Sequence, residues 1–197
     1  MSVRGCVLVA IEGTHASGKT TLAHALTAHY RARGVLVDCV PEPARTSPYI
    51  EETVIHSKGA FDLATEVDLF AAQTSATLRA ARHQHLLICD KTIVNVLAYA
   101  RLVLTADPSS VDVAVLDAMA AFCQAWAPIT YDVVFYLPDR YTVPADPLRA
   151  KVAHLRAETA EAIRGACAAV GSGADRCPCF DRLLRFRPNQ QAGKRKH

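Results

Sequence analysis

The sequence predicts an α/β protein built on a parallel sheet, and two observations carry this prediction. Short apolar runs recur along the chain at intervals that leave room for a helix between them. The first run ends at a glycine-containing loop that leads directly into a helical segment. Such alternation is typical of a parallel sheet with helices on both faces. The expected strands are 6–11, 35–40, 86–89 and 133–137, with a weaker fifth near 176–180.

Helices are predicted where apolar residues recur with helical spacing between these runs. The expected helices are 19–33, 62–82, 94–104, 111–126 and 148–170. The last is followed by Gly171-Ser172-Gly173, a typical helix stop. Three prolines and charges of both signs in 138–147 indicate an exposed irregular loop after the fourth strand.

Length and charge favour one soluble domain that acts on a small ligand. A chain of 197 residues, 51% hydrophobic and 21% charged, is ample for one core and short for two. We expect a single domain over 1–187 and a flexible basic tail over 188–197. The net charge of +3 includes Lys194, Arg195 and Lys196. The remaining charge is near neutral, so the sequence predicts no binding to a nucleic acid polymer.

Cysteine usage and hydropathy favour a cytoplasmic protein. The seven cysteines are odd in number and mostly isolated within apolar runs, which indicates a reducing compartment. Cys177 and Cys179 are two residues apart, but no second pair completes a zinc site. Asp112 and Asp117 interrupt the longest apolar stretch, so no membrane-spanning segment is expected.

The loop after the first strand matches a phosphate-binding motif. Residues 13–20 read Gly, any four residues, Gly-Lys-Thr, between an apolar run and a helix. Backbone N–H groups of such a loop, together with the helix N-terminus, bind phosphate groups. We therefore predict a bound nucleotide, taken to be ATP, while the choice between ATP and GTP stays open. The expected binding residues are Gly13, His15, Ala16, Ser17, Gly18, Lys19, Thr20 and Thr21. His15 is assigned no chemistry of its own.

Magnesium is predicted to accompany the nucleotide. The Thr20 hydroxyl follows the lysine of the motif, and Asp90 ends the strand expected at 86–89. Both supply the hard oxygen ligands that magnesium prefers. The alternative for Asp90 is a simple helix N-cap.

Four segments in this order resemble the thymidylate kinase and deoxynucleoside kinase branch of P-loop kinases, together with ribosylnicotinamide kinases. They are Ile11-Glu12-Gly13, Pro41-Glu42-Pro43, Leu69-Phe70-Ala71-Ala72, and Ile88-Cys89-Asp90-Lys91 running on to Leu97-Ala98-Tyr99. The resemblance implies the P-loop NTPase three-layer sandwich, with a parallel five-stranded sheet in the order 2-3-1-4-5. It also implies transfer of the γ-phosphoryl group of Mg-ATP to a hydroxyl of a nucleoside-like molecule.

The resemblance implies a catalytic role for Glu42. The residue follows the second expected strand, so its carboxylate should lie at the carboxyl edge of the sheet, where such proteins bind ligands. The matching glutamate of nucleoside kinases acts as the base for the attacking hydroxyl. Lys19 is expected to stabilise the transferring phosphoryl group. The alternative is that Glu42 caps a helix or pairs with Arg45.

The acceptor site is expected near Gln73; the alternative is that Gln73 occupies an ordinary exposed helix position. Thymidylate kinases continue Phe-Ala-Ala with Asp-Arg, whereas this chain has Gln73-Thr74. They also have an arginine before Glu-Pro, where this chain has Pro41. The two arginines that would hold a monophosphate are therefore missing, which favours a nucleoside. In nucleoside kinases, a glutamine on the equivalent helix pairs with the base. Arg45 could instead hold a phosphate, as an arginine soon after this glutamate is seen in ribosylnicotinamide kinases.

Further candidates flank the acceptor. Phe70 and Tyr99 could sandwich a base, or simply belong to the core. Lys91 keeps the charge of the arginine usual at this place but lacks its bidentate fork. The resemblance places a mobile lid at about 138–151, where Arg140 and Arg149 could close over the phosphoryl group or be plain surface charges.

Two alternative functions are open at this point. One is a nucleoside monophosphate kinase of the thymidylate type. The other is a regulatory nucleotide-binding protein or ATPase. The second is disfavoured because the chain has no Asn-Lys-any-Asp tetrapeptide, no second glycine-rich signature, and Asp90-Lys91 where motor ATPases have Asp-Glu. A homodimer formed through 111–126 is also possible, since an apolar helix face can serve as an interface.

Overall fold

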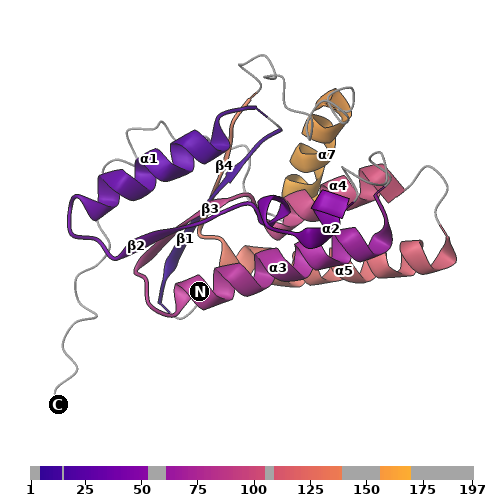
Figure 1. Cartoon of the computed structure of the whole chain (residues 1–197), viewed down its shortest axis with the longest axis horizontal. Helices are drawn as coiled ribbons and strands as arrows, with labels where there is room; N and C mark the ends of the chain where they lie inside the picture. The colour runs from indigo at the N-terminus through magenta and orange to yellow at the C-terminus, as the bar shows by residue number, and fades with distance from the viewer. Residues whose placement is uncertain (1–4, 15, 53–60, 105–108, 139–155, 170–197) are drawn as a thin grey trace.

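The sheet has four parallel strands within the described part of the chain, in the order β2-β3-β1-β4 (Figure 1). The computed structural model describes residues 5–14, 16–52, 61–104, 109–138 and 156–169. The strands are β1 (Val7–Glu12), β2 (Val37–Val40), β3 (Leu86–Asp90) and β4 (Val133–Tyr136). The predicted fold class is therefore confirmed. The fifth strand expected near 176–180 lies outside the described residues.

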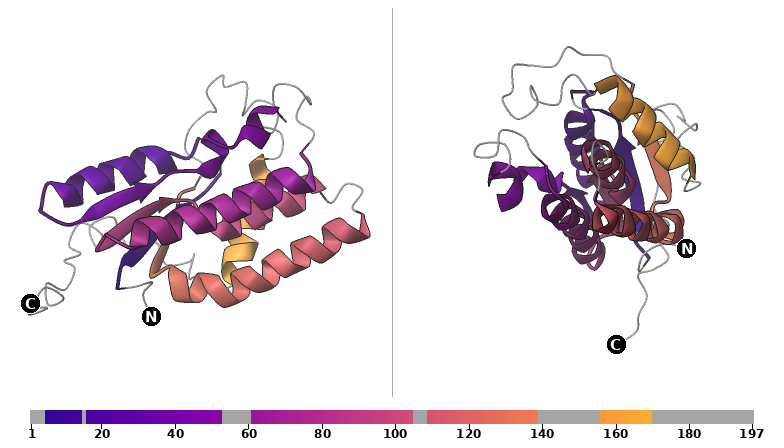
Figure 2. Two further views of the ribbon diagram at one scale, coloured as in Figure 1. Left: turned by 60° about the horizontal axis from the view of Figure 1, so that its bottom comes forward. Right: turned by 90° about the vertical axis from the view of Figure 1, so that its right-hand side faces the viewer.

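Helices cover both faces of the sheet because successive strand side chains point to opposite sides. Val9 and Ile11 of β1 face one layer, while Leu8 and Ala10 face the other. The first layer is α1 (Lys19–Arg31). The second layer comprises α3 (Leu63–Ala81), α4 (Ile93–Leu104), α5 (Ser110–Thr130) and α7 (Arg156–Ala169). Figure 2 shows α1 on one side of the sheet and α3, α4 and α5 on the other.

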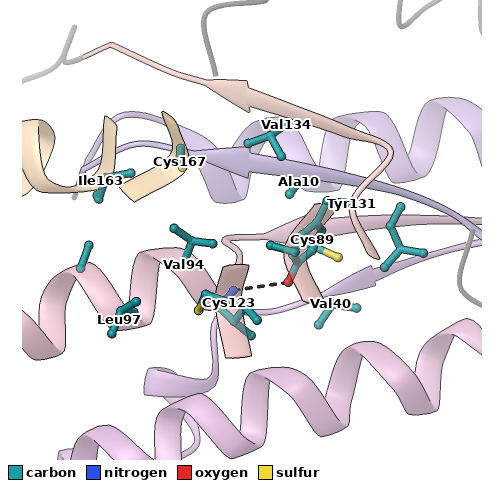
Figure 3. Close-up of a cluster of buried hydrophobic side chains, with 14 of the residues drawn as sticks. Ala10, Val40, Cys89, Val94, Leu97, Cys123, Tyr131, Val134, Ile163 and Cys167 are labelled. Atoms are coloured by element: carbon teal, nitrogen blue, oxygen red, sulfur yellow. Dashed lines mark hydrogen bonds between the residues drawn. The ribbon is translucent and has the colours of Figure 1, made fainter. Parts of the chain in front are cut away.

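Helix α4 is the centre of the second layer, since it packs against α3, α5 and α7. Its Val94 and Leu97 meet Ile163 of α7 and Cys123 of α5 in the larger core cluster (Figure 3). The Tyr131 hydroxyl accepts a hydrogen bond from the first backbone N–H of α4, at 3.3 Å. This packing fixes the start of α4, which lies directly after the carboxyl end of β3.

The predicted helices are confirmed with shifted ends, and two short elements were missed. Helix α5 runs four residues beyond the expected end at 126 and contains Pro128. Helix α7 begins at Arg156, whereas residues 148–155 of the expected helix lie outside the described part. The segment after β2 forms a 3-10 turn, η1 (Pro43–Arg45), and a short helix, α2 (Pro48–Glu51). Each opens with a proline, which favours the first position of a helix.

One described helix, α5, is long and apolar enough over Val111–Thr130 to cross a membrane by length and composition. Core helices of soluble proteins pass the same test, so this is weak evidence. In the fold, α5 buries Leu116, Met119 and Cys123 in the core. Val113 and Ile129 of the same helix are exposed, and the predicted homodimer through this helix stays a prediction.

Candidate functional site

The loop between β1 and α1 has the backbone shape that phosphate binding requires. Gly13, Ala16 and Gly18 all adopt positive φ angles, of 141°, 57° and 92°. A Cβ on Gly13 would lie 2.6 Å from the Leu137 carbonyl oxygen, so only glycine fits there. Such a backbone turns N–H groups toward an anion. The predicted residue His15 lies outside the described residues.

Lys19, the motif lysine, is folded back onto its own loop. Its Nζ donates to the Thr14 carbonyl oxygen at 2.5 Å and lies 3.5 Å from the Ser17 hydroxyl. Burial, with a further contribution from the nearby Lys91 ammonium, lowers the pKa of Lys19 to about 8. Negative phosphate oxygens would favour the charged form, so the side chain is suited to anion binding. Thr21, the last predicted loop residue, is exposed on α1.

The two predicted metal ligands are in contact. The Thr20 hydroxyl donates to Asp90 Oδ2 at 2.5 Å, although 70 positions separate them. Asp90 is 1% exposed, and its Oδ1 is buried without a hydrogen-bond partner. An unpartnered carboxylate oxygen beside a hydroxyl fits a cation that shares its remaining ligands with phosphate and water. The described residues hold no group of three His, Cys, Asp or Glu side chains that could bind a metal by themselves.

Glu42 pairs with Lys91. Lys91 Nζ donates to Glu42 Oε1 at 2.5 Å, and the side chains are only 8% and 11% exposed. The Glu42 carboxylate raises the pKa of Lys91 above its ordinary value despite burial, so the ammonium stays charged. Lys91 Nζ also lies 5.1 Å from the centre of the Tyr99 ring. The ammonium therefore fixes the Glu42 carboxylate at the carboxyl edge of the sheet.

Lys91 has an unusual backbone that directs it toward this place. Its φ of 90° is in the left-handed region, which favours glycine, and its N–H donates to the Ile11 carbonyl oxygen at 3.2 Å. The same residue accepts a hydrogen bond at its own carbonyl oxygen from Gln73 Nε2, at 3.2 Å. Strained backbone of this kind is typical of functional sites.

Gln73 is fully buried, not exposed on its helix. Its Nε2 is directed at Lys91, while its Oε1 is buried without a partner. Phe70, one turn earlier on α3, is half-buried and meets Phe122 of α5 edge to face, with ring centres 5.6 Å apart. Arg45 is exposed in η1. The predicted lid residues Arg140 and Arg149 lie outside the described residues.

Two buried glutamates at the site were not assigned a role from the sequence. Glu12 Oε1 accepts from the Thr92 N–H and hydroxyl, and its Oε2 accepts from Asn95 Nδ2. These hydrogen bonds connect the end of β1 to the start of α4, which follows directly after Asp90 and Lys91 in the chain. Glu12 belongs to Ile11-Glu12-Gly13, one of the four segments that carry the family resemblance, but the sequence alone did not indicate its structural role.

Glu66 is the second buried glutamate, and its burial disfavours the charged carboxylate. It is 2% exposed on α3, and its Oε2 is buried without a hydrogen-bond partner. Burial raises the pKa of the Glu66 carboxyl from 4.5 to about 7, although the nearby Lys91 ammonium acts in the opposite direction. The spacing of polar residues could have indicated that Glu66 faces the interior, because residues 66, 73 and 77 are polar and lie on one face of the helix.

Replacing Glu66 by glutamine is expected to stabilise the protein above pH 7. The folded state holds the proton up to about pH 7, whereas the unfolded chain releases it near 4.5, so stability falls as pH rises between these values. Glutamine removes a penalty of about 2–3 kcal/mol, or roughly 5–10 °C in Tm. Thermal unfolding of both proteins at pH 8 and pH 4.5 measures the difference.

The pH dependence distinguishes this cause from a general effect on packing. We expect the gain from Glu66→Gln to be present at pH 8 and to disappear at pH 4.5. Glu161→Gln, at an exposed position of α7, is the control and should shift Tm at neither pH. An equal gain at both pH values would contradict a penalty from ionisation.

The fold and the site define a class of protein: an α/β domain with a P-loop, in which Lys19, Thr20 and Asp90 face the same edge of the sheet. A family model described as an AAA domain matches residues 8–173, so the chain belongs to that family. No curated protein matches the chain.

Solved structures share the fold. A NadR protein in complex with NR has a TM-score of 0.62 at 20% identity; the match covers 84% of this chain and 41% of that one. The deoxyadenosine kinase from M. mycoides with bound dATP has a TM-score of 0.51 at 17% identity, covering 81% of each. The thymidylate kinase from Ehrlichia chaffeensis has a TM-score of 0.56 at 15% identity, covering 85% and 84%. The resemblance to this group is thus confirmed at the level of the fold.

Proposed function

We propose that the protein transfers the γ-phosphoryl group of Mg-ATP to a hydroxyl of a small nucleoside-like molecule. The observation that carries this proposal is the buried Glu42–Lys91 pair at the edge of the sheet that bears the phosphate loop. A nucleotide-binding module without chemistry has no need of a carboxylate held there by a fixed ammonium. The fold shared with nucleoside and nucleotide kinases supports the same reaction class.

In this mechanism Glu42 is the general base. The acceptor hydroxyl gives its proton to the carboxylate as its oxygen bonds to the γ-phosphorus, and the bond to the bridging oxygen breaks to release ADP. Once Glu42 is neutral, the positive charge of Lys91 is no longer balanced by it. Lys91 and Lys19 then stabilise the negative charge that spreads over the transferring group. We propose Arg140 or Arg149 as a further contributor from a lid over 138–151.

Thr20 and Asp90 are the proposed protein ligands of magnesium, which neutralises phosphate charge when bound. Asp90→Asn retains the hydrogen-bond geometry but lowers the negative charge, so we expect kcat/KM to fall by about 10²-fold at 1 mM magnesium. Raising magnesium should recover part of this loss. Activity is measured across a magnesium titration, with Glu161→Gln as control. An unaltered magnesium dependence would remove Asp90 from the metal site.

The charges around the acceptor favour an unphosphorylated molecule. Among the described residues, Lys91 is already engaged by Glu42, and Arg45 is exposed. Glu66 is buried without a partner for Oε2, and above about pH 7, where its carboxyl group is ionised, it would repel a monophosphate. The nucleoside monophosphate kinase is therefore the second candidate, favoured only by Arg45. The AAA domain family match keeps a regulatory ATPase as another outcome. We propose a cytoplasmic location, as the cysteine usage predicts.

Release of ADP from Mg-ATP, measured against nucleosides and their monophosphates, tests the proposal. We expect stimulation by at least one unphosphorylated nucleoside and less by the corresponding monophosphate. Stimulation by monophosphates alone would support the second candidate. Equal ADP release with and without every acceptor would favour the regulatory ATPase.

A further inference from the structure

Lys91 is held in an unfavourable backbone conformation by hydrogen bonds on both sides of its Cα. Its φ of 90° lies in the left-handed region, which is disfavoured for a residue with a Cβ. The peptide group before the Cα donates its N–H to the Ile11 carbonyl oxygen at 3.2 Å. The peptide group after the Cα is held by two side chains. Gln73 Nε2 donates to its carbonyl oxygen at 3.2 Å, and Glu12 Oε1 accepts from its N–H, that of Thr92, at 2.8 Å. These contacts fix the direction in which the Lys91 side chain leaves the backbone.

Gln73 reaches this peptide group from the neighbouring helix α3, and its side chain is 0% exposed. Only the NH2 end of a primary amide can donate a hydrogen bond, so the carbonyl acceptor determines which end of the side chain faces Lys91. Gln73 Oε1 is buried, and no hydrogen-bond partner for it lies among the described residues. Within the described part of the chain, the contact with the Lys91 carbonyl oxygen is therefore what the Gln73 amide provides.

The Lys91 side chain transmits this constraint to the proposed base. Lys91 Nζ donates to Glu42 Oε1 at 2.5 Å, and the two side chains are 8% and 11% exposed. The same Nζ lies 5.1 Å from the centre of the Tyr99 ring. A turn of the Lys91 backbone would move the ammonium and, with it, the carboxylate that it binds. Because misplacing a reacting group by about 1 Å can lower a rate by about 10²-fold, such a movement would be felt in the reaction.

We propose that Gln73 is a positioning residue for phosphoryl transfer, which holds the Lys91 backbone so that the Lys91 ammonium places the Glu42 carboxylate. This inference rests on the proposed function. It gives Gln73 a different task from the base pairing that the family resemblance implies, because the Gln73 amide donor is already used within the protein. The two tasks have different kinetic consequences. A residue that contacts the base alters acceptor binding and the choice between bases, whereas a positioning residue alters kcat for every acceptor alike.

A double-mutant cycle between Gln73→Met and Lys91→Met tests this role. Methionine has nearly the length of glutamine but cannot donate to the carbonyl oxygen. We expect Gln73→Met to lower kcat by roughly 10- to 100-fold for each nucleoside that is phosphorylated. The KM for the nucleoside should stay within about threefold of wild type. In Lys91→Met, where no ammonium binds Glu42, adding Gln73→Met should lower kcat by less than about threefold. Transfer of ³²P from labelled ATP is sensitive enough to follow the slow double variant.

Two controls separate this effect from a loss of folded protein. Thr77→Val alters another buried residue of α3, whose hydroxyl donates to the Gln73 backbone carbonyl oxygen at 2.8 Å. This variant should keep kcat within about threefold of wild type, because Thr77 does not contact the Lys91 peptide groups. The stoichiometry of binding of a fluorescent ATP analogue gives the fraction of folded protein in each variant, and kcat is corrected for it.

The outcomes distinguish this inference from the function on which it rests. If the wild-type protein phosphorylates no nucleoside, the proposed function fails, and the inference fails with it. If nucleosides are phosphorylated, an undiminished kcat in Gln73→Met, or an equal loss with and without Lys91→Met, overturns the inference alone. It is also overturned if Gln73→Met raises KM or alters the choice between bases while kcat is retained, because Gln73 would then contact the acceptor.

Discussion

Replacing Glu42 by glutamine is expected to lower kcat by about 10²- to 10⁴-fold, the usual contribution of general-base catalysis. Glutamine has nearly the same shape but cannot take the hydroxyl proton, whereas Lys19, Thr20 and Asp90, the proposed ligands of Mg-ATP, are unchanged. The dissociation constant for Mg-ATP should therefore remain within about threefold of wild type. Steady-state kinetics gives the first quantity, and fluorescence titration with an ATP analogue gives the second.

Two further results would locate the cause of this loss. Glu161→Gln removes an exposed carboxylate of the same type and should keep full activity. The loss should not be regained at higher acceptor concentration, because the missing step is proton removal and not acceptor binding. Undiminished kcat in Glu42→Gln would remove Glu42 from the mechanism.

Replacing Lys19 by methionine should have an effect of similar size through a different step. Methionine preserves the length of the side chain but loses the ammonium, which donates to the Thr14 carbonyl oxygen in the structure and is proposed to bind phosphate. We expect kcat to fall by at least about 10²- to 10³-fold, as for the loss of one transition-state donor. Lys19→Arg keeps the charge, but the guanidinium is larger and planar whereas the ammonium is compact, so this variant should recover little of the lost activity. Activity near the wild-type level in Lys19→Met would contradict phosphate binding by this loop.

The phosphate loop and Asp90 could be predicted because their positions depend on the backbone. A strand that ends at a glycine-rich loop places the loop at the carboxyl edge of the sheet, and a neighbouring parallel strand ends at the same edge. The contact between Thr20 and Asp90 follows from this geometry. The strand order β2-β3-β1-β4 was predicted from the family resemblance, since periodicity alone does not arrange strands.

The sequence did not predict which individual side chains contact one another. Glu42 was expected to cap a helix or pair with Arg45 if it was not catalytic, whereas it pairs with Lys91, 49 positions away. That pair depends on how β2 lies beside β3 and on the left-handed backbone at Lys91. Burial of Glu66 was missed because α3 reads as an ordinary amphipathic helix, and what covers its polar positions depends on how it packs with α4.

The AAA domain family match bears on how the nucleotide is used. Oligomeric motor ATPases have a strand that ends in Asp-Glu at the corresponding place. Here β3 ends at Asp90 and continues with Lys91, which pairs with Glu42, two residues after the end of the neighbouring strand β2. The carboxylate at the corresponding edge is therefore supplied by the segment after β2, where it is the proposed base for an acceptor hydroxyl. This difference supports the proposed transfer to a second molecule over hydrolysis.

The proposed phosphoryl transfer is tested most directly by following the γ-phosphoryl group itself. The protein is incubated with magnesium, γ-³²P-labelled ATP and the nucleoside that most stimulates ADP release, and the products are separated by chromatography. If the protein is a phosphotransferase, the label moves to the nucleoside, in amounts equal to the ADP formed, and Glu42→Gln abolishes this transfer. Label found only in inorganic phosphate, whatever acceptor is present, would contradict a phosphotransferase and identify an ATPase.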